Sequence, residues 1–74
     1  MNYKNHITAS PDIMMGKPVI KGTRITVELI LKKLSEGMKN DELLKAYPNI
    51  SEEDILAVLA YSADVISKEE ILVS

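Results

Sequence analysis

The stretch between Ile55 and Ala63 limits the possible folds of this chain more than any other feature. Only the Tyr61 hydroxyl and Ser62 are polar within it, so the helix that it predicts is apolar on nearly all sides. A surface helix carries one apolar stripe, whereas a helix that is apolar all round is buried on all sides. We expect one face of this helix to pack on the rest of the chain and another face to pack on a second copy.

The small size of the chain also favours a dimer. Its 74 residues form one domain, and a domain of this size buries only about 60% of its extended-chain surface. The chain has no cysteine, so neither a disulfide bond nor a Cys-based zinc site can stabilise it, and oligomerisation is the remaining common remedy. The alternative is a monomer whose other elements cover the helix. The residues expected at the dimer interface are Ile55, Val58, Leu59 and Ser62.

Glycine and proline divide the chain into an extended first part and a helical second part. Two of the three glycines and two of the three prolines lie within residues 3–25, which disfavours a helix there. Gly16 and Gly22 bracket a segment with β-branched residues, as turn positions would. We expect short extended segments near residues 4–8, 18–21 and 24–26.

Three helices follow, each predicted from apolar residues at helical spacing and from a polar residue that caps its first turn. The caps are Thr26, Asn40 and Ser51, and Gly37 and Pro48 end the first two helices. The expected ranges are 27–36, 41–47 and 52 to 63–66, with a short fourth helical turn at 68–73. The chain is thus expected to be one domain over residues 1–74, with an extended arm (1–26), a three-helix core (27–66) and a C-terminal turn (67–74).

Charge is distributed unevenly along the chain. Residues 1–40 carry seven cations against three carboxylates, net +4, whereas residues 41–74 carry two cations against eight carboxylates, net −6. This asymmetry is typical of a molecule with two faces for two partners. Solvated helix surfaces with unequal use of lysine explain it equally well.

The sequence offers few groups for catalysis. His6 is the only histidine, and without cysteine a Cys–His pair is excluded and a serine triad or a His-rich metal site is disfavoured. The acidic cluster at residues 52–54 lies in a predicted first helical turn, where Ser51-x-x-Asp54 makes a near capping box and the helix dipole favours anions. We expect no enzyme activity, no catalytic residue, no cofactor and no metal site.

The second and third predicted helices, with the turn at residues 48–50, have suitable lengths for a helix-turn-helix. Its recognition helix would present Glu52 and Glu53 to DNA, whose phosphates repel carboxylates. Any DNA contact must therefore come from basic residues of the arm and the first helix. Arg24 has an alternative, an ion pair with a carboxylate within the chain or across the dimer. The residues expected to contact nucleic acid are Lys17, Lys21, Arg24, Lys32 and Lys33.

One pattern of residues covers roughly residues 6–63. It consists of His6–Thr8, Pro11, Ile13, Gly16–Ile25, Gly37, Tyr47–Pro48 and Ser51–Ile55. Together these segments resemble domain-of-unknown-function family four-three-three, and the Gly-Lys-Pro-Val-Ile-x-Gly-Thr-Arg core is the most specific part. The chain departs from the family at Met15, where a second glycine is common, and at Thr26, where proline is frequent.

The resemblance implies a mainly α fold, a homeodomain-like three-helix (helix-turn-helix) bundle preceded by short N-terminal β-strands. It also implies an antitoxin role, because members of the family resemble the antitoxin half of toxin–antitoxin pairs whose toxin is a PIN-type ribonuclease. It implies no catalytic residue.

We therefore expect a cytoplasmic, antitoxin-like regulator that binds a PIN-type ribonuclease as a homodimer and, as a further expectation, its own promoter DNA. The alternative is a dimerisation or protein-interaction module that does not bind DNA. The start at residues 1–6 lacks the apolar run of a secretory signal. The longest apolar stretch is far shorter than the about 20 residues that span a bilayer, so no membrane contact is expected.

Overall fold

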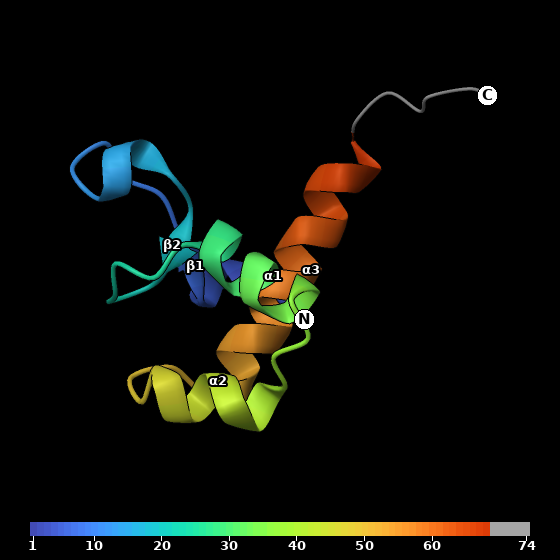
Figure 1. Cartoon of the computed structure of the whole chain (residues 1–74). Coiled ribbons are helices and arrows are strands. Elements are labelled where there is room, and N and C mark those ends of the chain that lie inside the picture. The colour runs from blue at the N-terminus through green and yellow to red at the C-terminus, as the bar shows by residue number, and fades with distance from the viewer. Residues whose placement is uncertain (69–74) are drawn as a thin grey trace.

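A computed structural model describes residues 1–68 and shows a mainly helical chain with a short two-stranded antiparallel sheet near its N-terminus (Figure 1). The elements in chain order are the 3-10 turn η1 (Tyr3–Asn5), strand β1 (Ile7–Thr8), the 3-10 turn η2 (Met14–Gly16), strand β2 (Val19–Ile20) and the helices α1 (Val27–Ser35), α2 (Asn40–Ala46) and α3 (Glu52–Ser67). The turn expected at residues 68–73 lies outside the described residues, except for Lys68, which ends α3.

The sheet joins the start of the chain to the segment that precedes α1. β1 and β2 pair antiparallel, with Ile7 opposite Ile20 and Thr8 opposite Val19. Both strands are shorter than the segments expected from the sequence. Residues 24–26 form a single bridge to Val19 rather than a third strand. The sheet is therefore a small cover on the helices rather than a layer of its own.

A tight turn follows β2. Gly22 has a φ of +81°, which residues with a Cβ rarely adopt, and the Thr23 N–H donates to the Ile20 carbonyl oxygen at 3.0 Å. The Thr23 hydroxyl donates to the same oxygen at 2.7 Å and accepts from the Ile25 N–H at 3.0 Å. Thr23 thus closes this turn with both its backbone N–H and its hydroxyl.

α1 begins and ends with the predicted signals. Thr26 caps it, because its Oγ1 accepts from the Leu29 N–H at 3.0 Å. After the last turn, Gly37 has a φ of +94°, and its N–H donates to the Leu34 carbonyl oxygen at 3.0 Å. This is the left-handed end that glycine commonly provides.

The starts of α2 and α3 differ in how well the sequence predicted them. At α3 the near capping box is confirmed: the Asp54 N–H donates to Ser51 Oγ at 3.2 Å, and the Ser51 N–H donates to Asp54 Oδ2 at 2.9 Å. At α2 the predicted cap is wrong by one residue, because Lys39 stands at the N-cap and Asn40 lies inside the helix. The Lys39 N–H donates to Glu42 Oε1 at 2.9 Å. The Glu42 carboxylate, rather than the expected Asn40 side chain, therefore makes the side-chain hydrogen bond at the start of α2.

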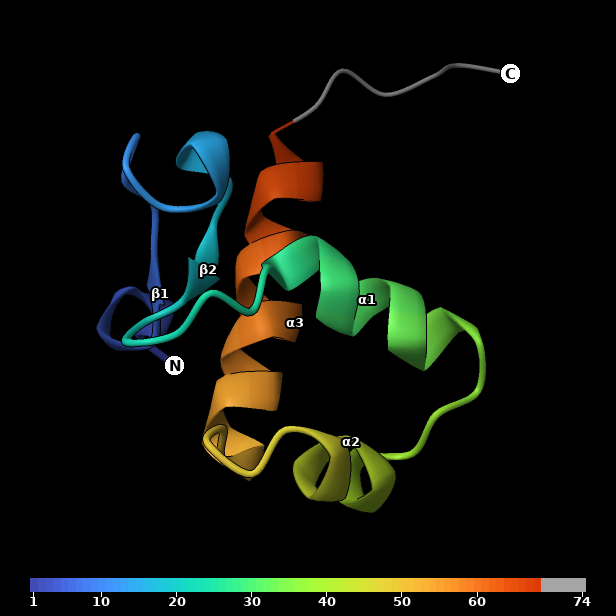
Figure 2. The same ribbon diagram turned by 60° about the vertical axis from the view of Figure 1, so that its left-hand side comes forward.

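α3 is the longest element, and the core forms along its inner face. Figure 2 shows the sheet on one side of α3 and α1 and α2 on the other. No helix within residues 1–68 is long and apolar enough to cross a membrane. The buried hydrophobic residues are Ile7, Val19, Ile20, Val27, Ile30, Leu43, Ile50, Ile55, Ala57 and Val58.

Candidate interaction surfaces

The outward face of α3 is apolar and open to solvent. Leu56, Leu59 and Ile66 keep 50%, 43% and 64% of their surface exposed. Ala63 is also exposed, and Ala60 is half-buried between them. Exposed helix faces normally carry charged and polar residues, so this face is unusual. We call these five residues the α3 face.

Two of the four residues predicted at the dimer interface are wrong. Ile55 and Val58 have no exposed surface, because they point toward α1 and the sheet and form part of the core. Leu59 is exposed as an interface requires. Ser62 is half-buried, and its hydroxyl donates to the Val58 carbonyl oxygen at 2.7 Å. An apolar sequence shows that a helix has two apolar faces but not which of them turns inward.

A groove of about 350 Å³ lies between the start of α1 and the last turns of α3. Ile66 belongs both to this groove and to the α3 face, so the two apolar surfaces are continuous. The sequence does not reveal this groove, because its lining comes from three separate segments. The lining residues are Pro18, Val27, Glu28, Leu31, Tyr61, Ser62, Val65 and Ile66.

The five predicted nucleic-acid residues do not form one patch. Lys17 Nζ lies 3.0 Å from Glu28 Oε1, at the start of α1. Lys21 and Arg24 are exposed on the turn after β2, and neither pairs with a carboxylate among the described residues. In both Figure 1 and Figure 2 this turn projects on the side away from the C-terminal end of α1. That end carries Lys32, which is exposed, and Lys33, which is half-buried.

The first turn of α3 makes a histidine–carboxylate contact that the sequence did not predict. His6 Nδ1 lies 2.9 Å from Asp54 Oδ1, and His6 Nε2 lies 4.0 Å from Glu53 Oε2. Burial alone would raise the pKa of Asp54, but the hydrogen bonds with His6 and with the Ser51 backbone and hydroxyl outweigh it and lower that pKa. The acidic turn is thus partly occupied by the chain itself, which ties the segment before β1 to α3.

A second link joins the N-terminal segment to the end of α3. The Tyr3 hydroxyl donates to Asp64 Oδ2, and Lys68 Nζ lies 3.2 Å from the same oxygen. The hydrogen bond with Asp64, helped by burial, raises the pKa of Tyr3, while that bond and Lys68 lower the pKa of Asp64. Tyr3 also stacks edge-on against Tyr61, with ring centres 5.4 Å apart. These contacts fix the inner side of α3 and leave its outward face untouched.

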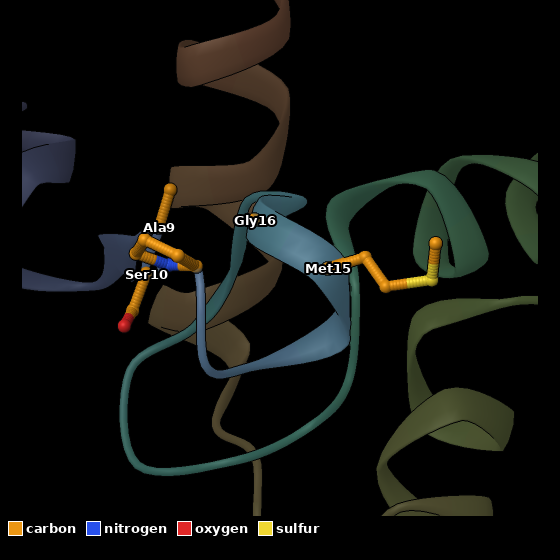
Figure 3. Close-up of a pocket in the computed structure, with 5 residues that line it drawn as sticks. Ala9, Ser10, Met15 and Gly16 are labelled. Atoms are coloured by element: carbon orange, nitrogen blue, oxygen red, sulfur yellow. The ribbon is translucent and has the colours of Figure 1, made fainter.

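The loop between β1 and β2 encloses a hollow of about 500 Å³ (Figure 3). Its lining, which comprises Ala9, Ser10, Pro11, Met15 and Gly16, contains no charged side chain. Figure 3 shows the Met15 side chain pointing away from Ala9 and Ser10, and 92% of its surface is exposed. Among residues 1–68, no group of three or more His, Cys, Asp or Glu side chains could hold a metal ion. The surface features described above are the apolar α3 face and the exposed basic residues Lys21 and Arg24 on the turn after β2.

Comparison with known proteins places this arrangement in a family. The family model described as "Protein of unknown function (DUF433)" matches residues 7–62. The chain belongs to the DUF433 family. The match covers the sheet, α1, α2 and most of α3, so the surfaces above lie mainly within the family domain. The family resemblance found in the sequence is confirmed.

Two relatives show how this DUF433 chain compares with longer proteins. The crystal structure of a DUF433 member from Anabaena variabilis superposes with a TM-score of 0.81 at 29% identity, covering 88% of this chain and 64% of that one. The uncharacterized protein y4eO of Sinorhizobium fredii is 34% identical over 56 residues, which are 76% of this chain and 25% of y4eO. The chain therefore spans about a quarter of y4eO and less than two thirds of the Anabaena chain.

Proposed function

We propose that this DUF433 protein is an antitoxin-like regulator that binds a PIN-type ribonuclease as a homodimer. In this proposal α1, α2 and α3 form a homeodomain-like helix-turn-helix unit that serves mainly as a scaffold for protein contacts. The single observation that carries it is the charge-free α3 face, which leaves three large apolar side chains in water. Contiguous apolar patches on small proteins commonly mark interaction sites. The nuclease as the partner follows from the family resemblance alone.

The acidic half of the chain supports a protein partner over a purely DNA-binding role. Glu52 and Glu53 are exposed on the first turn of α3, where a recognition helix would meet DNA. His6 lies near this turn but leaves Glu53 mostly exposed. Phosphates would be repelled there, whereas a basic surface of a nuclease that binds RNA would be attracted.

A DNA role is the second candidate, and the turn after β2 favours it. Lys21 and Arg24 are exposed there without a carboxylate partner within residues 1–68, so they are available for phosphate contacts. Such contacts would position a dimer on DNA without reading its sequence. A dimerisation module without any DNA role is the alternative.

The proposal predicts that a gene beside that of this protein encodes a PIN-type ribonuclease, and it is tested with that ribonuclease. Both chains are co-expressed with a tag on the nuclease only, and RNA cleavage is measured before and after the DUF433 chain is added. We expect a stable complex and loss of cleavage at equimolar amounts. A PIN-type ribonuclease from an unrelated gene pair is the control and should stay active. The proposal is wrong if the neighbouring gene encodes no such nuclease, or if that nuclease neither binds the chain nor loses activity.

A further inference from the structure

The α3 face differs from the outward faces of the other helices. α1 exposes Glu28 and Lys32, and the exposed Glu36 follows its last residue. α2 exposes Asp41, Glu42 and Lys45. The α3 face carries no charge over about three turns. Its members Leu56, Leu59, Ala63 and Ile66 follow one another at intervals of three, four and three residues. This is the a/d spacing by which two helices pack along a shared seam.

We propose that the α3 face binds the same face of a second copy, with the two α3 helices antiparallel about a two-fold axis. In this arrangement Leu56 lies beside Ile66 of the second copy, and Leu59 lies beside Ala63 of the second copy. The inference rests on the dimeric part of the proposed function and gives that dimer its surface, direction and register. It does not depend on the nuclease or on DNA.

The composition of the α3 face favours a second copy of the chain as the molecule that covers it. A two-fold interface must be self-complementary. If one residue of the first copy contacts a second residue of the other copy, the same contact is repeated with the two copies exchanged. The α3 face is symmetric in this sense, with a large residue at each end, Leu56 and Ile66, and a large and a small residue, Leu59 and Ala63, between them. Each copy therefore supplies both the protrusions and the spaces that the other needs. The arrangement closes as a dimer, because each α3 face is used up by its counterpart.

Packing and charge both select the antiparallel direction. In a parallel pair Ala63 would face Ala63 of the other copy and leave a gap, whereas an antiparallel pair fills that space with Leu59. A parallel pair would also bring Glu52 and Glu53 of both copies together at one end, where like charges repel. In the antiparallel pair the sixteen-residue helix separates these acidic turns by about 24 Å. Each acidic turn then lies near the last turn of the other helix, which carries Lys68.

Disulfide trapping tests the inference cleanly, because the natural chain contains no cysteine. The variants Leu56→Cys and Ile66→Cys are purified separately, oxidised alone and as an equimolar mixture, and then analysed by mass. We expect a covalent dimer of one Leu56→Cys chain with one Ile66→Cys chain in the mixture. Each variant alone should give little dimer, because its two cysteines would lie about 15 Å apart along the seam, and a disulfide bridges Cα atoms less than about 7 Å apart.

Controls keep the outcome unambiguous. Both changes are at exposed positions, and an unchanged helical circular dichroism spectrum shows that each variant folds. Lys45→Cys, exposed on α2, should not form dimers in any combination. Efficient dimers of either α3 variant alone would show a parallel pair, and an absence of dimers in the mixture would show that two α3 faces do not pair in this register. Both results would overturn the inference, and neither affects nuclease inhibition, which is measured separately.

Discussion

At the scale of single residues, Met15 adopts a backbone conformation that glycine takes more readily. Met15 has a φ of +59°, in the left-handed region that costs a residue with a Cβ about 1–2 kcal/mol. Its side chain is almost fully exposed and packs on nothing that would offset this cost. The chain tolerates the strain because the loop between β1 and β2 lies outside the core.

Met15→Gly should therefore stabilise the protein by about 1 kcal/mol or less, since part of the gain is lost to the greater freedom of glycine in the unfolded chain. Urea unfolding followed by circular dichroism measures the difference. The matched control is Glu36→Gly, at an exposed residue with a φ of −84°, which should be neutral or destabilising. Destabilisation by Met15→Gly would contradict the assigned backbone conformation.

Asp54 has two structural roles: it caps α3 and it hydrogen-bonds to His6. Its pKa is lowered in the folded state, so its stabilising contribution is complete above the unfolded value of about 3.9 and is lost as the pH falls through the folded pKa. Asp54→Asn should cost about 1 kcal/mol near pH 6, the usual size for a lost helix-capping bond. The cost should shrink as the pH falls below 4, because wild-type Asp54 is then also neutral.

Urea unfolding at several pH values measures this dependence. Glu53→Gln is the matched control, because Glu53 is the neighbouring carboxylate, is mostly exposed and lies 4.0 Å from His6. It should change stability little at any pH. An equal loss for both variants, or a loss for Asp54→Asn that persists at pH 2, would contradict the role assigned to Asp54.

At the scale of elements, the sequence predicts best what is local. Thr26, Gly37 and Ser51 act within one helical turn of their own position, and all three bound helices as expected. The contact between His6 and Asp54 joins residues 48 positions apart, so no local sequence pattern predicts it. The inward side of α3 depends on how α1, α2 and the sheet pack, so Ile55 and Val58 could not be distinguished from Leu59 by hydrophobicity alone.

The turn after β2 and the end of α1 carry the basic residues that a DNA role requires. Lys21→Ala combined with Lys33→Ala should weaken binding to the protein's own upstream DNA. It should also reduce the slope of log affinity against log salt by about one unit for each lost phosphate contact. Gel-shift titrations at several salt concentrations measure both effects, and the dimer should survive.

The double variant Lys4→Ala with Lys45→Ala removes the same charge from two exposed positions outside the predicted set and is the matched control. It should bind DNA with nearly the affinity of the wild type. If the unmodified protein fails to retard its own upstream DNA at low salt, with and without the nuclease, the DNA role is wrong and the module without DNA binding remains.

At the scale of the whole molecule, the chain resembles half of a larger core. Its inner residues form a well-buried cluster, yet its longest helix turns an apolar face to water. A domain of 74 residues gains much from covering such a face, because it buries little surface by itself. The proposed dimerisation through the α3 face would link the apolar run in the sequence to the proposed role as a partner-binding regulator.

Sedimentation equilibrium at micromolar concentration tests this claim most directly, with Leu59→Glu and Val58→Glu beside the unmodified protein. The account predicts a dimer for the unmodified protein and a folded monomer for Leu59→Glu, whose charge stays in water once the second copy leaves. Val58→Glu should unfold the chain, because it buries an unpaired charge in the core. A stable monomer for the unmodified protein, or a dimer of undiminished affinity for Leu59→Glu, would contradict the account.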